Sequence, residues 1–374
     1  MDAIQLSKKL GGKIEIRSKI KLTQKNLATL YTPGVADVSR AIAKNSKLAR
    51  EYTIKKNTVA VISDGSAVLG LGNIGPEAAL PVMEGKALLF KELAGVDAIP
   101  IVLATQDTEE IIKIVKALAP TFGGINLEDI SAPRCFEIEE RLKKELDIPV
   151  MHDDQHATAI VVLAGLLNAL KVVAKKITKI KIVISGTGAA GVAIAKLLLA
   201  AGAKNIIMVD SQGIIFKERT GDLNGSKMEI ARLTNPENLQ GTLQAALEKA
   251  DVFIGVSGPN LLTAKDISRM NPEAIVFAMA NPIPEIMPDL ARAGGAKVVA
   301  TGRSDFANQL NNVLVFPGIF RGVLDNNVKS ITQKHKLAAA YAIAGLIKNP
   351  KSGKIIPAAL DKKVAKAVAD VFKK

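Results

Sequence analysis

The chain has 374 residues, of which 48% are hydrophobic, enough to bury a large core and to form two domains. Its net charge of +14 could attract nucleic acid, but only 3% of its residues are aromatic and tryptophan is absent, so a base-stacking surface is poorly supplied. The single cysteine, Cys135, excludes an internal disulfide framework, and without an apolar leader or a membrane-length apolar run we expect a cytoplasmic protein.

The first half of the chain alternates short apolar runs with helical patterns. The apolar runs predict strands at 58–62, 98–103, 123–127 and 148–152. The segments between them predict helices at 77–93, 108–118 and 135–146. This rhythm indicates an α/β fold with a mostly parallel sheet covered on both faces. We assign it to an N-terminal domain of residues 1–154.

The second half begins with a long predicted helix at 155–173 and again alternates strands with helices. Its predicted strands are 181–185, 205–209, 251–255, 274–278 and 297–300. Its other predicted helices are 192–201, 336–347 and 362–372. We expect residues 155–374 to form a Rossmann dinucleotide-binding domain.

A glycine-rich loop supports that expectation. The strand at 181–185 leads straight into a G-x-G-x-x-G pattern made of Gly186, Thr187, Gly188, Ala189, Ala190 and Gly191. Such glycines let the backbone approach a pyrophosphate at a helix N-terminus. Asp210 ends the next strand and is placed to bind the adenosine ribose. An acid there disfavours a 2′-phosphate, and no arginine occurs in 211–213, so NAD is favoured over NADP. A glycine turn that binds no nucleotide is the alternative.

The same pattern occurs earlier, at 70–75, but without the second strand and acid at the expected offsets. We interpret this loop, including Leu71 and Gly72, as a backbone cradle for an anionic substrate. A purely structural tight turn fits the spacing equally well.

Two pairs of adjacent carboxylates come at the ends of predicted strands. They are Glu128 with Asp129 and Asp153 with Asp154. Bringing four acids together is costly unless a cation neutralises them, and carboxylates suit Mg²⁺ or Mn²⁺ better than zinc. The alternative is two solvated loop ends that never meet. His152 and His156 have the spacing of a zinc-protease helix, but the base position between them holds an aspartate.

Two residues are candidates for proton transfer. Lys86 lies in the predicted helix at 77–93, and a partly desolvated lysine facing a metal cation would have a lowered pKa and could act as a base. Tyr31 precedes a Pro-Gly turn that would hold it rigidly. A surface lysine and a packing aromatic residue are the ordinary alternatives.

In order along the chain, these motifs resemble those of the malic enzymes, in the short bacterial and archaeal form. The matching segments are 31–34, 64–65 with 70–72, 84–86, 127–129, 153–155, 186–191, 280–282 and 311–313. The resemblance implies that Glu128, Asp129 and Asp154 bind Mn²⁺ or Mg²⁺, with Asp153 beside Lys86. It implies Lys86 as general base and Tyr31 as general acid. Asn281 and Asn312 are implied at the substrate or nicotinamide, and we also expect Ser257 at the cofactor.

The implied reaction is the oxidative decarboxylation of (S)-malate to pyruvate with NAD⁺, NADP⁺ remaining possible. Lys86 would take the C2 hydroxyl proton as hydride leaves, and Tyr31 would protonate C3 after CO₂ is lost. An amino-acid-dehydrogenase-like enzyme and a nucleotide-sensing binding protein are the rival interpretations. We expect a homodimer, in which Tyr31 serves its own site or that of its neighbour.

Overall fold

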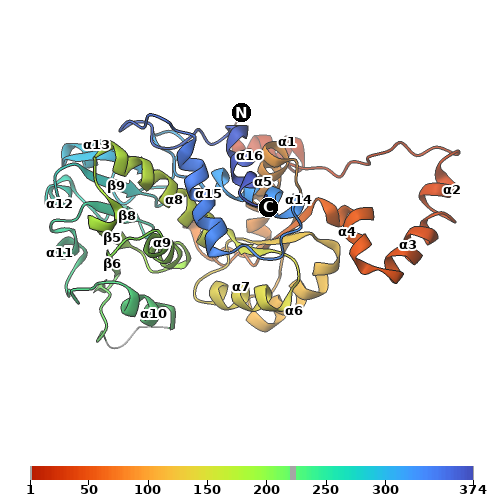
Figure 1. Ribbon diagram of the computed structural model, residues 1–374, viewed down its shortest axis with the longest axis horizontal. Coiled ribbons are helices and arrows are strands. Elements are labelled where there is room, and N and C mark those ends of the chain that lie inside the picture. The colour runs from red at the N-terminus through yellow and green to blue at the C-terminus, as the bar shows by residue number, and fades with distance from the viewer. Residues whose placement is uncertain (1, 220–224, 374) are drawn as a thin grey trace.

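The computed structural model describes residues 2–219 and 225–373 and contains two β-sheets, one in each half of the chain (Figure 1). The first sheet is parallel, with the strand order β2-β1-β3-β4. Its strands are β1 (Thr58–Ser63), β2 (Asp97–Val102), β3 (Gly124–Leu127) and β4 (Val150–His152). All four predicted strands of the first half are therefore confirmed.

The second sheet has the order β10-β9-β8-β5-β6-β7, and β7 alone runs antiparallel to its neighbour. Its strands are β5 (Lys181–Ser185), β6 (Asn205–Asp210), β7 (Gly213–Ile214), β8 (Val252–Gly255), β9 (Ala274–Ala278) and β10 (Ala296–Thr301). The glycine-rich loop follows β5, in the middle of this sheet. The predicted Rossmann arrangement is confirmed, with the short β7 as an addition at the edge.

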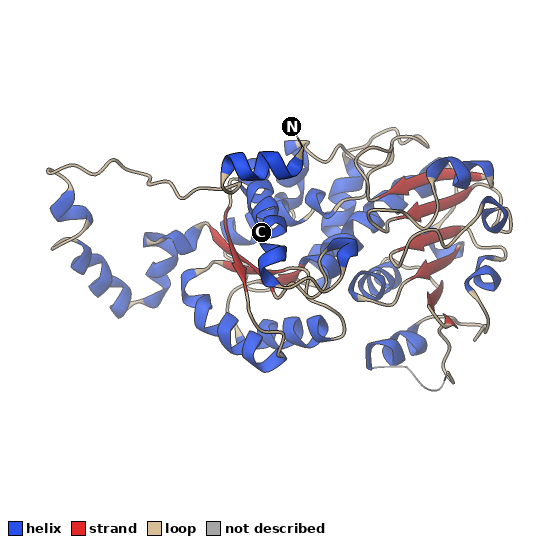
Figure 2. Cartoon of the chain, turned by 180° about the vertical axis from the view of Figure 1, so that it is seen from behind, coloured by secondary structure: helices blue, strands red, loops and turns tan. Residues whose placement is uncertain are grey.

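Helices cover both faces of each sheet (Figure 2). Those of the first half are α1 (Ala3–Leu10), α2 (Leu27–Leu30), α3 (Val35–Lys44), α4 (Ala49–Tyr52), α5 (Pro76–Ala94), α6 (Thr108–Leu118) and α7 (Arg134–Glu145). Those of the second half are α8 (Asp153–Val172), α9 (Ala189–Ala200), α10 (Gly225–Leu233), α11 (Leu243–Leu247), α12 (Ala264–Ile267), α13 (Pro288–Ala293), α14 (Phe316–Asp325), α15 (Gln333–Gly345) and α16 (Lys362–Asp370). Short 3-10 helices are η1 (Ser46–Leu48), η2 (Ile54–Lys56), η3 (Leu69–Leu71), η4 (Ala119–Thr121), η5 (Ile177–Lys179) and η6 (Asn312–Leu314).

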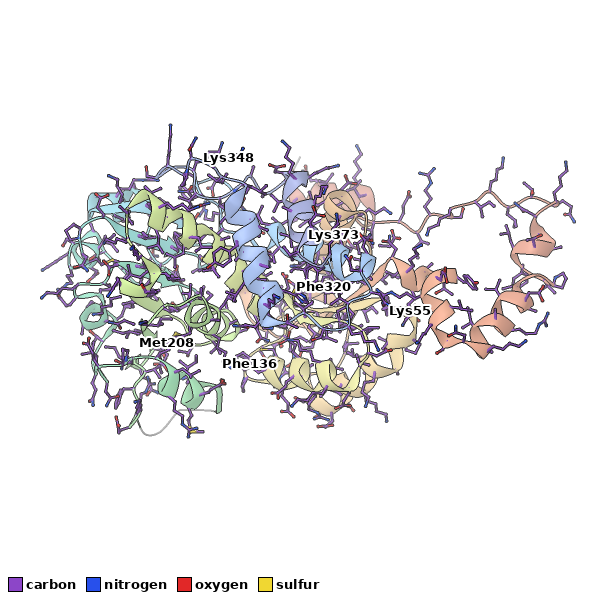
Figure 3. All side chains as sticks on the ribbon, in the orientation of Figure 1. Lys55, Phe136, Met208, Phe320, Lys348 and Lys373 are labelled. Atoms are coloured by element: carbon purple, nitrogen blue, oxygen red, sulfur yellow. The ribbon has the colours of Figure 1, made fainter. Side chains whose placement is uncertain are left out.

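The central strands are mostly apolar because both of their faces are buried. In β1, Val59 and Val61 belong to one hydrophobic cluster, whereas Ala60 and Ile62 belong to another on the opposite face. Large aromatic side chains such as Phe320 fill the interior, and lysines such as Lys348 point outward from the rim (Figure 3). The unbroken apolar runs in the sequence thus follow from burial on two sides.

Helix α8 passes through the centre of the molecule. Its 20 residues and mean hydropathy of 1.4 would be enough to cross a membrane, yet 72% of the apolar window is buried inside the protein. It contacts α9, α15 and η6, and its apolar residues share one hydrophobic cluster with β1 and β5. We therefore identify α8 as a core helix. It begins at Asp153, two residues before the predicted start, because acidic residues are favourable in the first turn of a helix.

The last helices return to the first sheet. α14 and α16 contact α5, and the ring centroids of Phe90 and Phe316 lie 4.7 Å apart. We propose that the structural unit around the first sheet includes these C-terminal helices in addition to residues 1–154.

The N-terminal segment was not predicted as helices, yet it forms α1 to α4. None of the residues of α1, α2 and α3 is buried. Residues 21–48 extend away from the body of the molecule as an arm (Figure 1). We refer to residues 21–48 as the N-terminal arm.

Candidate active site

The predicted carboxylates meet where two neighbouring strands end. β3 and β4 pair in parallel, with Leu127 opposite His152. Glu128 and Asp129 follow β3 directly, and Asp153 and Asp154 form the first turn of α8 directly after β4. Because carboxyl ends of parallel strands share one edge of a sheet, this register brings the two pairs together.

Glu128, Asp129 and Asp154 form a cluster suited to a metal ion. One carboxylate oxygen from each residue lies within 4.8 Å of the others. Glu128 and Asp129 are only 3% and 4% exposed, and the Asp129 Oδ2 atom is buried without a hydrogen-bond partner. Asp154 also accepts a hydrogen bond from the Asp129 backbone N–H at 2.9 Å. A buried carboxylate oxygen with no donor is what a hard cation would satisfy, so the residues fit Mn²⁺ or Mg²⁺.

The electrostatics of the cluster lead to the same conclusion. Burial, together with the nearby charge of Asp154, raises the pKa of Glu128 to about 7 against the opposing attraction of Lys86. Burial and the charges of Asp154 and Glu128 raise the pKa of Asp129 to about 9. Burial and Asp153 raise the pKa of Asp154 to about 6. Each raised pKa means that the protein groups alone stabilise the ionised carboxylate poorly at this position.

Lys86 projects from α5 into the same cluster. Its Nζ atom lies 2.6 Å from Asp153 Oδ2 and 2.8 Å from Glu128 Oε1, and it stacks 4.2 Å from the centre of the Phe316 ring. Burial alone would lower the pKa of Lys86, but the charges of Asp153, Glu128 and Asp154 outweigh burial and raise it. The protein groups alone therefore do not produce the lowered Lys86 pKa that was expected from the sequence. A lowered pKa requires a cation that neutralises these carboxylates and leaves burial as the dominant influence.

Asp153 lies behind Lys86 and is separate from the three-carboxylate cluster. Its side chain is fully buried, and its Oδ2 atom accepts hydrogen bonds from Lys86 Nζ and from Asn312 Nδ2, both at 2.6 Å. Spacing could not distinguish Asp153 from Asp154. The structure does, because only Asp154 shares the cluster with Glu128 and Asp129.

A cavity of about 950 Å³ connects this cluster to the second sheet. Its walls bring together most of the predicted site residues, namely Lys86, Glu128, Asp129, Asp154, Gly188, Ala189, Ala190, Ser257, Asn281 and Asn312. A cavity of this size accommodates a small substrate together with part of a larger cofactor.

The glycine-rich loop 186–191 has the shape expected of a pyrophosphate site. Gly186 has a φ of 117°, and a Cβ atom on Gly191 would lie 1.9 Å from the Gly186 carbonyl oxygen. α9 begins at Ala189, and the preceding Gly188 offers no side chain to cap its first N–H groups. A Cβ atom on Gly188 would enter open space, so the backbone here is accessible to a ligand.

Asp210 ends β6, as predicted, and its carboxylate is paired with two cations. Its Oδ2 atom lies 2.9 Å from Arg219 Nη2 and 2.8 Å from Lys227 Nζ. Burial would raise the pKa of Asp210, but the hydrogen bonds from Arg219 and Lys227 outweigh it and lower the value. Residues 211–213 hold no arginine, but Arg219 reaches Asp210 through the tertiary fold, a contact that the sequence next to Asp210 does not reveal.

Seven of the predicted site residues are not among those that line the cavity, namely Tyr31, Leu71, Gly72, Asp153, Gly186, Gly191 and Asp210. Tyr31 is 67% exposed on the N-terminal arm. Leu71 and Gly72 are not among the residues that line the cavity, whereas the adjacent Leu69 and Gly70 are. A Cβ atom on Gly70 would lie 1.9 Å from the Asn281 carbonyl oxygen, so this glycine allows close packing between the two halves of the chain.

Sequence reasoning also missed Glu285, which positions the cofactor side of the cavity. Its carboxylate accepts hydrogen bonds from the backbone N–H of Ser257 at 3.0 Å and of Ala280 at 3.1 Å. The side chain is fully buried although no cation pairs with it among the described residues. A glutamate between two prolines, in the segment 282–285, was the available signal.

Comparison with known proteins gives a consistent result. The family model described as "Malic enzyme, N-terminal domain" matches residues 11–143, and "Malic enzyme, NAD binding domain" matches residues 156–373. The chain is 61% identical over 362 residues to an NAD-dependent malic enzyme of Geobacillus stearothermophilus, covering 96% of this chain and 75% of that protein. It is 54% identical over 376 residues to a bifunctional malic/malolactic enzyme of Bacillus subtilis, covering 100% of this chain and 92% of that protein.

A solved structure agrees over the whole chain. The crystal structure of the NAD-dependent malic enzyme from Thermotoga maritima superposes with a TM-score of 0.97 at 52% sequence identity. The alignment covers 100% of this chain and 99% of that one. The fold and the placement of the two sheets are thus shared along the full length.

Proposed function

The chain belongs to the malic enzyme family, whose NAD-dependent members oxidatively decarboxylate malate, and we propose that it carries out this reaction in the cavity between its two sheets. The observation that carries the proposal is the single cavity that joins the buried carboxylates and Lys86 to the glycine-rich loop of the second sheet. A substrate held at the carboxylates would then face a nicotinamide whose pyrophosphate lies at α9.

We propose that Glu128, Asp129 and Asp154 hold Mn²⁺ or Mg²⁺. A bound divalent cation would lower the pKa of the C2 hydroxyl of malate and stabilise the negative charge that develops as CO₂ leaves. The cluster needs this charge, because burial raises the pKa of all three carboxylic acids.

The chain's own groups would handle the proton. We propose that Lys86, in its neutral form, accepts the C2 hydroxyl proton at Nζ. Asp153 would hold that atom in place, because its Oδ2 accepts a hydrogen bond from Lys86 Nζ. Asn312 Nδ2 donates to the same oxygen and so fixes the position of the Asp153 carboxylate. NAD⁺, bound at Gly186, Gly188, Ala189, Ala190, Gly191 and Asp210 with Ser257 and Asn281 nearby, would accept the hydride from C2.

We further propose a homodimer in which Tyr31 protonates C3 in the neighbouring subunit's site. In the described part of the chain, no residue of α2 or α3 on the N-terminal arm is buried, and the arm exposes Tyr31 by 67% and Leu22 by 63%. Such apolar side chains on a projecting segment favour an interface with a second copy. The buried, free Cys135 favours the reducing cytoplasm as the location.

The reaction itself is tested with purified full-length protein, Mn²⁺, (S)-malate and NAD⁺. We expect NADH and pyruvate in equal amounts, and no product after the metal is removed with EDTA. Accumulation of oxaloacetate would instead indicate a simple malate dehydrogenase. Formation of lactate without net NADH would indicate a malolactic reaction, and the absence of any turnover would indicate a binding protein.

The contribution of Tyr31 is tested with differently tagged Lys86→Met and Tyr31→Phe chains, purified as mixed dimers. If Tyr31 acts in the neighbouring site, each mixed dimer has one complete site and should show about half of the wild-type activity. If Tyr31 acts in its own chain, both sites are defective and the mixed dimer stays inactive.

A further inference from the structure

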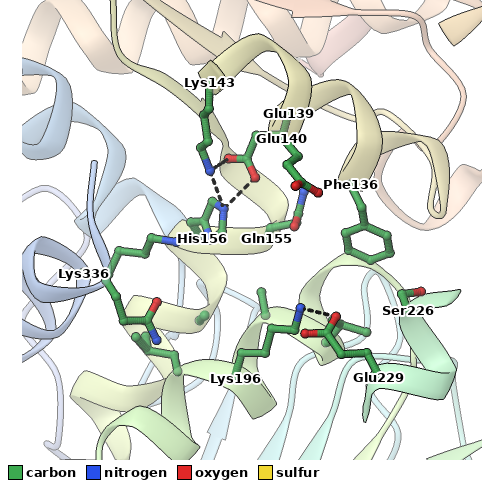
Figure 4. Close-up of a pocket in the computed structure, with 15 residues that line it drawn as sticks. Phe136, Glu139, Glu140, Lys143, Gln155, His156, Lys196, Ser226, Glu229 and Lys336 are labelled. Carbon is green, nitrogen blue, oxygen red and sulfur yellow. Dashed lines mark hydrogen bonds and ion pairs between the residues drawn. The ribbon is translucent and has the colours of Figure 1, made fainter. Parts of the chain in front are cut away.

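A second cavity, of about 390 Å³, lies between α7, α8, α9, α10 and α15 (Figure 4). Among the described residues, its walls share no residue with the catalytic cavity. Its polar side chains come from both halves of the chain, with Lys143 on α7, Gln155 on α8, Lys196 on α9 and Lys336 on α15. The proposed reaction uses none of them.

Two hydrogen-bond donors at this cavity, on the half-buried Lys336 and the buried Gln155, have fewer partners than such positions usually offer. Lys336 Nζ lies 3.0 Å from His156 Nδ1, but no carboxylate among the described residues lies within ion-pair distance of it. Gln155 is only 5% exposed, and its Nε2 atom has no hydrogen-bond partner in the described part of the chain. A buried amide N–H₂ without an acceptor is costly, as is an ammonium held away from water.

The acids of this region do not compensate Lys336, because each is engaged elsewhere. Glu139 lies 2.6 Å from Lys143 Nζ, and Glu229 lies 2.7 Å from Lys196 Nζ. Glu140 is paired at 2.6 Å with Lys144, outside the cavity. The positive charge of Lys336 is therefore the one left over at this cavity among the described residues.

The same imbalance affects the pKa of Lys336. Burial, together with the neighbouring charges of Lys143 and Lys196, lowers its pKa to about 8. The attraction of Glu139 opposes these effects only in part. An anion placed between the three ammonium groups would remove this penalty.

Part of the wall is apolar. Phe136, Val192, Ala193 and Leu197 line the cavity together with the polar side chains. The volume exceeds that of an inorganic ion and lies at the lower end of the range of small-molecule sites. A ligand that fits both surfaces carries a charged oxyanion group on a short organic body.

We propose that this cavity binds a small organic anion, whose phosphate or carboxylate group is held by Lys336 and Gln155 while its carbon skeleton lies against Phe136. Hydrogen bonds connect this cavity to the reaction centre. Glu139 accepts hydrogen bonds from His156 Nε2 at 2.8 Å and from the His152 backbone N–H at 2.9 Å, immediately before Asp153. His156 and Glu139 thus link Lys336, and a ligand bound to it, to the junction of β4 and α8.

The test is a calorimetric titration of the full-length protein with Mn²⁺ and saturating malate but no NAD⁺, so that the catalytic cavity is filled and no turnover occurs. The probes are glycerol 3-phosphate, inorganic phosphate and succinate. We expect one binding site per chain for glycerol 3-phosphate or succinate, and weaker binding of inorganic phosphate, which has no organic body. The tighter of the two organic probes identifies the charged group that the site prefers.

Variants localise the binding. Lys336→Met keeps the apolar stem and should weaken binding at least about tenfold, the usual cost of losing a charge-assisted hydrogen bond, whereas Lys336→Arg should stay within about threefold of wild type. The matched control is Lys334→Met, on the same helix but exposed. If Lys336→Met lowers the melting temperature markedly, Lys336→Gln replaces it. Absence of probe binding below about 10 mM, or equal binding by folded Lys336→Met protein, would overturn the proposal.

Discussion

The two walls of the catalytic cavity are built in opposite ways. The wall from the first sheet consists of charged side chains that are buried and bonded to each other, with Lys86 between Asp153 and Glu128. The wall from the second sheet is formed around the glycine-rich loop, where Gly188 leaves the backbone accessible and Gly191 packs closely against Gly186 behind it. Removing a charged group should therefore impair the first wall, whereas adding a methyl group to a glycine should impair the second.

The largest effect is expected on the charged wall, from Lys86→Met. The loss of the general base should lower kcat by about 10²–10⁴-fold, while NAD⁺ affinity changes little, because the second wall is untouched. Steady-state kinetics and NAD⁺ titration measure both. Lys91→Met, on the same helix but exposed, is the control and should keep its activity. More than a tenth of wild-type kcat in Lys86→Met would remove Lys86 from the chemistry.

Asp129→Asn should separate the stability of the charged wall from its function. Without metal, the substitution removes a buried carboxylate that repels its neighbours, and the melting temperature should rise. With Mn²⁺ present it should fall below that of wild type, because Mn²⁺ affinity drops by roughly 10–100-fold. Thermal melts with and without Mn²⁺ show whether the order reverses. Asp147→Asn, at a highly exposed aspartate, should show no reversal.

Gly191→Ala tests the glycine wall by adding one methyl group. The new Cβ would lie 1.9 Å from a backbone oxygen, so the loop must shift, and NAD⁺ affinity should fall by about tenfold. Mn²⁺ affinity should remain unchanged. Gly345→Ala places its Cβ in open space and serves as the control. Equal losses of NAD⁺ and Mn²⁺ affinity would mean that the two walls are not separable.

The smallest effect concerns Asp210, the acid at the end of β6. Asp210→Ser removes the acid from Arg219 and Lys227, and these cations should then attract a 2′-phosphate. We expect the ratio of kcat/KM for NADP⁺ to that for NAD⁺ to rise by several-fold, up to about tenfold. The double variant Asp210→Ser/Lys227→Met should reverse much of this rise. An unchanged ratio would show that Asp210 does not determine the choice of cofactor.

The parts predicted well from sequence are those whose signal is local. β1 and β5 were placed to within one residue, because strands buried on both faces have continuous apolar runs. The meeting of Glu128 with Asp154 could also be anticipated, because each follows one of two adjacent parallel strands. In a parallel sheet, residues that follow adjacent strands lie at the same edge, so their positions in the sequence predict that they meet.

The parts that were missed depend on contacts between distant segments. Arg219 reaches Asp210 across an intervening turn, and α14 packs on α5 from more than 200 residues away. The arm carrying Tyr31 contributes nothing to its own core, so hydrophobic periodicity could not define its role. No local pattern encodes any of these contacts.

Helix α8 also determines how this protein can be divided into pieces. At 20 residues it is about 30 Å long, carrying Asp153 and Asp154 at one end and contacting α9 and α15 along its length. A break between residues 154 and 155 would leave the first fragment with the proposed metal-binding carboxylates but without the rest of helix α8, which holds Asp154 in place. The second fragment would expose an apolar helix made for burial. Expressed separately, the two halves should be insoluble or poorly folded, and expressed together they should assemble only by docking at α8.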